Sequence, residues 1–163
     1  MSVEISPAQP LFERWGVLEL EKGLRLWTRV MLVYVATSPG PPPNQQLRVA
    51  STVVTQAEQK FRGEPTNGPP DIRGAKLLRT YETVQTLTEA ESYYHLPNGV
   101  ILCLKLKAQK ARRFSSFVPE GDPLIQLEHV TEVSTVAGEG VPPPARLELG
   151  IPGTTPPGAV DQT

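Results

Sequence analysis

The sequence is most informative first through what it lacks. Of its 163 residues one is cysteine, Cys103, which excludes an intramolecular disulfide and any zinc site built from several cysteines. The longest uncharged apolar run, Val30 to Ala36, is far shorter than the ~18–20 residues that cross a bilayer. The N-terminal residues MSVEISPAQP include no apolar stretch of the kind found in secretory signals. We therefore expect an intracellular or virion protein that is neither secreted through a signal peptide nor membrane-spanning.

The motifs that usually reveal an enzyme are also missing. The sequence has no phosphate-binding glycine loop, no G-x-S-x-G elbow and no H-E-x-x-H. Its two histidines, His95 and His129, could act with nearby glutamates as a metal site or a base, but this needs a convergence in space that the sequence does not show. Cys103 stands between two leucines and is expected to be buried and unreactive. We predict no enzyme activity, no metal and no cofactor.

Charge is nearly balanced, whereas proline and glycine are abundant. A net charge of −1 gives no overall attraction to nucleic acid or to an anionic membrane. The chain has 18 prolines and 13 glycines, which indicates many turns and extended segments. Binding to a charged partner would therefore have to come from a local patch.

Alternating apolar residues predict a mostly β fold. Residues 15–36 are expected to form a hairpin that turns at Lys22-Gly23, and residues 92–107 a second one that turns at Asn98-Gly99. Near the end of the first hairpin Met31, Val33 and Val35 are apolar as well, which predicts a strand buried on both faces or covered by another subunit.

Further strands are predicted at residues 46–54 and 124–136, while residues 72–87 match both strand and helix spacing and are assigned to a strand because they are rich in threonine. Thr55 with Glu58, and Thr88 with Glu91, have the spacing of capping boxes and predict one or two short helices. We find no internal repeat in the sequence.

A cluster of positive charge is the most noticeable local feature. No acidic residue interrupts the stretch from Glu91 to Glu120, which contains Lys105, Lys107, Lys110, Arg112 and Arg113. With Phe114, Phe117, Tyr93 and Tyr94 close by, these cations could hold phosphates and stack bases. The alternative, which we favour, is a sheet edge protected by lysines that can also contact an acidic surface of a neighbouring chain.

The predicted organisation is an N-terminal arm at residues 1–14, a β-rich domain at 15–137, and a proline-rich extended arm at 138–163. In the last arm Leu147, Leu149 and Ile151 have strand spacing and could add to the sheet of another chain. The fold class we predict is an antiparallel β-sandwich or barrel. The function we expect is that of a structural subunit in a homo-oligomer or larger assembly, for example a capsid-decorating, neck or tail protein of a phage. The alternative is a nucleic-acid-binding β-barrel that uses residues 105–117.

Overall fold

The computed structural model of the chain describes residues 2–42, 44–66, 73–96 and 99–136. These residues form ten β-strands and, as their only helical element, the 3₁₀ turn Gln59–Phe61. Among them, no helix has the length and apolar character needed to cross a membrane. The strands are β1 (Glu4–Pro7), β2 (Pro10–Arg14), β3 (Gly16–Glu21), β4 (Leu24–Ser38), β5 (Asn44–Ala57), β6 (Leu77–Tyr81), β7 (Gln85–Thr88), β8 (Glu91–His95), β9 (Ile101–Phe117) and β10 (Pro123–Val136).

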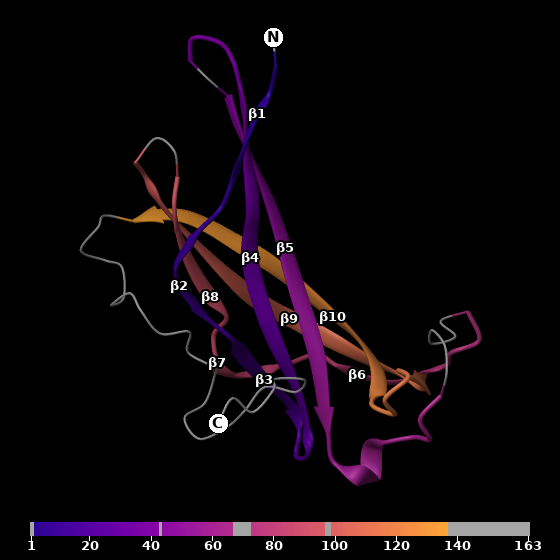
Figure 1. Cartoon of the computed structure of the whole chain (residues 1–163). Helices are drawn as coiled ribbons and strands as arrows, with labels where there is room; N and C mark the ends of the chain where they lie inside the picture. The colour runs from indigo at the N-terminus through magenta and orange to yellow at the C-terminus, as the bar shows by residue number, and fades with distance from the viewer. Residues whose placement is uncertain (1, 43, 67–72, 97–98, 137–163) are drawn as a thin grey trace, which may run out of the picture.

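The strands build two antiparallel sheets that pack as a sandwich. In the first sheet β4 pairs along its length with β5. The other side of β4 pairs with β3 near its start and with β1 near its end. In the second sheet β9 pairs along its length with β10. The other side of β9 pairs with β8 near its start and with β6 nearer its end. The long hairpins β4–β5 and β9–β10 cross one another (Figure 1). The prediction of a mostly β sandwich is confirmed.

The second half of the chain repeats the strand pairing of the first, although the sequence shows no obvious repeat. Each position of the first half matches the position 76 residues later in the second half. Phe12 thus matches Thr88, and Val17 matches Tyr93. The pair Phe12–Tyr93 and the pair Val17–Thr88 are therefore equivalent under this shift. Most side chains at matched positions differ, although pairs such as Leu11/Leu87, Glu13/Glu89, Gly23/Gly99 and Leu26/Leu102 are identical. The repeat is therefore clearest in register and bulge positions, and residue identities alone give only a weak signal of it.

Each half also contributes one strand to the sheet of the other half. β2 pairs with β8 in the second sheet, and β7 pairs with β3 in the first. The ion pair Glu13–Arg29 has a counterpart in Glu89–Lys105, since each residue of the second pair lies 76 positions after its match in the first. The exchange connects the two sheets through the backbone as well as through the core.

The core between the sheets is formed by aliphatic residues on the facing sides of β4 and β9. Leu104 is fully buried in a cluster with Val30, Leu32, Leu102 and Leu106. The even-numbered residues of β4 face this core up to Leu32, as strand alternation predicts.

A bulge changes the alternation in β4, and this corrects the prediction of a strand buried on both faces. Val33 has no partner in the β4–β5 ladder, since Leu32 pairs with Val49 and Tyr34 with Arg48. The extra residue turns Val35 into the core, where it is 2% exposed, and leaves Val33 45% exposed. The two apolar faces seen in the sequence are thus largely one core face with a bulge.

Both predicted hairpins are confirmed. Gly23 and Gly99 have φ values of +88° and +84° at the two turns, a conformation that glycine adopts without steric cost. The strand assignment within residues 72–87 is confirmed by β6 and β7. Cys103 is buried, as expected; its inertness toward thiol reagents stays a prediction.

The two capping-box signals do not produce capped helices. Glu58, not Thr55, precedes the single 3₁₀ turn, and it makes no capping hydrogen bond through its side chain. Thr88 ends β7 and Glu91 begins β8, because pairing with β3, β2 and β9 satisfies the backbone that a helix would have used.

The N-terminal segment is integrated into the sandwich. Residues 4–7 pair with β4 and residues 10–14 with β8, so the segment expected as an arm belongs to both sheets. Pro7 ends β1 and Pro10 begins β2, positions where a strand tolerates the missing N–H. The arm predicted at residues 138–163 lies outside the described residues.

Candidate functional site

The predicted basic stretch lies on the central strand β9, not on a sheet edge. β10 pairs with one side of β9, and β8 and β6 pair with the other. The interpretation as protection of an exposed edge is wrong for Lys105, which is paired with β8 and β10, whereas Lys107 lies between the β8 and β6 ladders and has a ladder partner on β10 alone. Both lysines alternate with the buried Leu104 and Leu106 and point away from the other sheet.

Two glutamates, Glu89 between β7 and β8 and Glu128 on β10, form ion pairs with four of these cations within the chain. Glu89 lies 2.6 Å from the Nζ of Lys107 and 3.8 Å from that of Lys105. Glu128 on β10 lies 2.9 Å from Arg112 and 3.5 Å from Lys110. The hydrogen bond from Arg112 lowers the pKa of Glu128, and the bond to Glu89 raises the pKa of Lys107.

This pairing changes the meaning of the positive stretch. The sequence shows five cations without an interrupting acid, but strand pairing places carboxylates from residues 89 and 128 among them. Of the aromatic residues proposed for base stacking, Tyr93 and Tyr94 are buried, at 6% and 2% exposed, whereas Phe114 and Phe117 are half-buried. The face therefore presents little free positive charge and few accessible rings to a phosphate backbone.

Arg113 differs from the other four cations because it points to the opposite side of β9. Its guanidinium lies 5.3 Å from the centre of the Phe61 ring, and its Nη1 is 3.9 Å from Glu21. Its Nε is buried without a hydrogen-bond partner among the described residues. Arg113 is thus a predicted site residue with a buried donor for which the described residues supply no acceptor.

Glu21 is the centre of a small polar network beside Arg113. It accepts hydrogen bonds from the hydroxyl of Tyr81 and from Arg79, the latter at 3.0 Å. Burial, followed by the hydrogen bond to Glu21, raises the pKa of Tyr81 to about 12. The network joins the end of β3 to β6, residues about 60 positions apart that no local sequence signal connects.

The raised pKa of Tyr81 gives a pH dependence of stability. Because the pKa is higher in the folded chain than its ordinary value of 10.0, the stabilisation by the neutral phenol is complete below pH 10 and is lost as the pH rises toward 12. We expect Tyr81→Phe to reduce the decline of the unfolding free energy over this pH range. Urea unfolding at each pH, with ultraviolet titration of phenolate in folded and unfolded protein, measures it. An identical decline in the variant would contradict the assignment.

A cavity of about 370 Å³ opens beside this network. Its polar residues are Glu21, Lys60 and Arg113. The ammonium of Lys60 lies 5.0 Å from the centre of the same Phe61 ring that Arg113 contacts. Its remaining lining residues are apolar: Phe61, Leu78, Phe114, Phe117 and Pro123.

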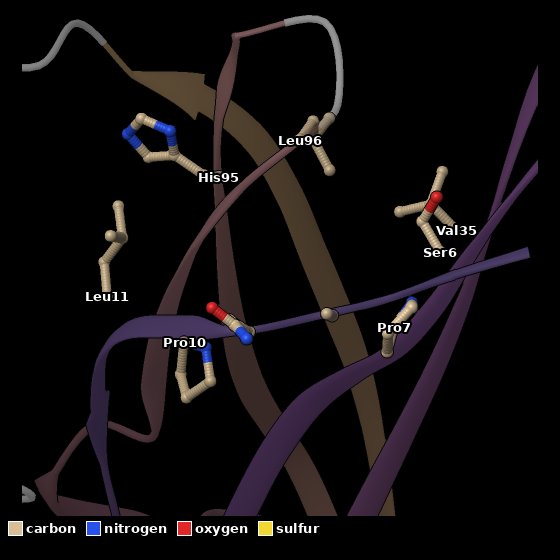
Figure 2. Close-up of a pocket in the computed structure, with 9 residues that line it drawn as sticks. Ser6, Pro7, Pro10, Leu11, Val35, His95 and Leu96 are labelled. Carbon is tan, nitrogen blue, oxygen red and sulfur yellow. The ribbon is translucent and has the colours of Figure 1, made fainter.

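A second cavity, of about 450 Å³, lies where β1 continues into β2 (Figure 2). It is lined by residues 6–11, Val35, His95 and Leu96. In Figure 2 the His95 ring lies above Leu11, on the strand that faces the β1–β2 segment. The cavity at Arg113 lies beside β6 and β9 and this one beside β1 and β4, but no lining residue of one lies 76 positions from a lining residue of the other.

The two histidines do not converge. His95 is exposed at the end of β8, whereas His129 lies within β10 with its Nε2 3.2 Å from Ser51 Oγ. Over the described ranges, no group of three histidine, cysteine or carboxylate side chains is placed to hold a metal ion. Leu147, Leu149 and Ile151, the remaining predicted site residues, lie outside those ranges.

Comparison with known proteins adds no further assignment: no protein-family model, no curated protein and no solved structure matches the chain.

Proposed function

We propose that the protein is a structural subunit that assembles with other copies through the free edge of β10. Within the described part of the chain β10 pairs with β9 alone, so one side of this 14-residue strand has unpaired backbone donors and acceptors. Val130 and Val133 on the same strand are each 49% exposed. This long, unpaired edge is the observation that carries the proposal.

The edge has few of the features that prevent strand addition. Natural edge strands are usually short, or carry lysine, proline or a bulge that blocks pairing with another chain. β10 contains neither lysine nor arginine, its one proline is its first residue, Pro123, and its ladder with β9 is regular from His129 to Val136, the irregularities lying at Pro123/Ile125 and Glu128/His129. An extended segment of another molecule can therefore add to this strand.

The segment that we propose to add is residues 146–151 of a neighbouring copy. Leu147, Leu149 and Ile151 alternate with Glu148 and Gly150, a pattern that suits a strand with one apolar side. The prolines at 142–144 and 152 stiffen the chain on both sides of this segment, which reduces the entropy lost on docking.

Two changes test the assembly. We expect the double variant Val130→Lys/Val133→Lys, and separately the deletion of residues 138–163, to shift the protein from a discrete oligomer toward the monomer mass. Light scattering coupled to size exclusion measures the mass, and circular dichroism confirms that both variants still fold.

Val33→Lys is the matched control, because Val33 is 45% exposed but lies on β4 away from the β10 edge. It should leave the mass unchanged. A wild-type protein that is monomeric at all concentrations, or an oligomer that both variants retain, would refute the proposal.

A further inference from the structure

We propose that the cavity at Arg113 binds a small monocarboxylic acid with an apolar body. The inference is independent of the assembly through β10. It rests on the side chains that line the cavity and on the contrast with the cavity at β1.

Positive charge at the cavity exceeds the negative charge available to a ligand. Lys60 and Arg113 both line it, and Glu21 is the single carboxylate among its described lining residues. Glu21 already accepts hydrogen bonds from Tyr81 and Arg79. Because Arg113 also lies within ion-pair distance of Glu21, at 3.9 Å, the described lining keeps an excess of one positive charge.

The guanidinium of Arg113 has donors to offer. The 3.9 Å between its Nη1 and Glu21 exceeds the ~3.2 Å limit of a normal N–H···O hydrogen bond. Its Nε has no acceptor among the described residues but is itself buried, so the donors that an incoming ligand meets are the terminal Nη groups. An incoming carboxylate supplies the two oxygens that a guanidinium binds best.

The apolar lining residues determine which ligand body fits beside the carboxylate. Leu78, Phe114, Phe117 and Pro123 surround the space beside the cations and give it an apolar surface. A volume of about 370 Å³ is at the lower end of pockets for small organic molecules. An acid with one aromatic ring and a short side chain, such as 3-phenylpropionate, matches both the size and the polarity.

The cavity at β1 provides a comparison within the same molecule. It has a similar size, about 450 Å³, but neither lysine nor arginine among its lining residues. Where the cavity at Arg113 has Glu21 at the end of β3, this cavity has His95 at the end of β8. A carboxylate ligand should therefore distinguish the two cavities.

Binding is tested by two-dimensional NMR titration of the full-length protein with 3-phenylpropionate and, separately, with its neutral amide. We expect the acid to shift resonances of residues 60–61, 78, 113–117 and 123, and the amide to bind at least about tenfold more weakly. Equal binding of acid and amide, shifts confined to residues 6–11 and 95–96, or no shift at millimolar acid would each overturn the inference.

Charge variants test whether the positive charges of the cavity bind the acid. Lys60→Gln removes an exposed cation of the cavity and should weaken acid binding several-fold, and Arg113→Gln should weaken it about tenfold. Lys76→Gln removes an exposed charge that does not line the cavity and should leave the affinity unchanged. If Arg113→Gln does not fold, the Lys60→Gln and Lys76→Gln pair decides alone: equal affinities would overturn the inference.

Discussion

Replacing Leu104 by alanine is expected to lower the unfolding free energy by about 2–5 kcal/mol, a large part of the stability of a domain of this size. Leu104 is fully buried on β9 and belongs to the cluster in which β4 and β9 meet. Alanine removes the transfer free energy of the missing carbons and leaves a space that paired strands on both sides of β9 cannot close.

Urea denaturation followed by tryptophan fluorescence measures this loss. Val33→Ala, at a half-exposed bulge position, is the control and should change stability by less than about 0.5 kcal/mol. A loss below about 1 kcal/mol at Leu104 would show that the two sheets are not packed as described.

The second large effect is expected at Glu13, which joins the exchanged strand β2 to β4. Its side chain is 3% exposed, and it accepts hydrogen bonds from both Nε and Nη2 of Arg29. This pairing, chiefly through hydrogen bonding, raises the pKa of the Arg29 guanidinium. Because the Arg29 side chain is 35% exposed and partly hydrated, we expect Glu13→Ala to cost about 2 kcal/mol, less than a fully buried pair would.

A double-mutant cycle distinguishes the pair from general packing. Glu13→Leu combined with Arg29→Met should be more stable than the sum of the single losses predicts, since no uncompensated charge remains. Lys105→Met, on the corresponding and more exposed pair with Glu89, is the control and should cost less than about 1 kcal/mol. Additive losses at Glu13 and Arg29 would contradict a direct interaction.

Local signals in the sequence predicted the local structure well. Lys22-Gly23 and Asn98-Gly99 place glycine where a positive φ is needed, and the alternation around residues 124–136 suffices to identify β10. Cys103 could be predicted to be buried because it stands between two leucines.

Long-range pairing could not be predicted in the same way. Whether Lys107 stands free or meets Glu89 depends on how β7, β8 and β9 are arranged, and the sequence between Glu91 and Glu120 gives no sign of the acid that arrives from outside it. The cavity at Arg113 combines residues from β3, β6, β9, β10 and the 3₁₀ turn, so it exists only in the folded chain.

The exchange of β2 and β7 has a consequence for how the chain folds during synthesis. β2 ends at residue 14, but its partner β8 begins at residue 91, so the ribosome must deliver a further 77 residues before the first strand of the second sheet can pair. Until then the apolar side of Phe12 has no sheet to join. Contacts of this sequence separation slow folding and prolong the exposure of unpaired strands. A nascent chain stalled before β8 should therefore be protease-sensitive throughout and depend on chaperones, whereas release of the complete second half lets both sheets close together.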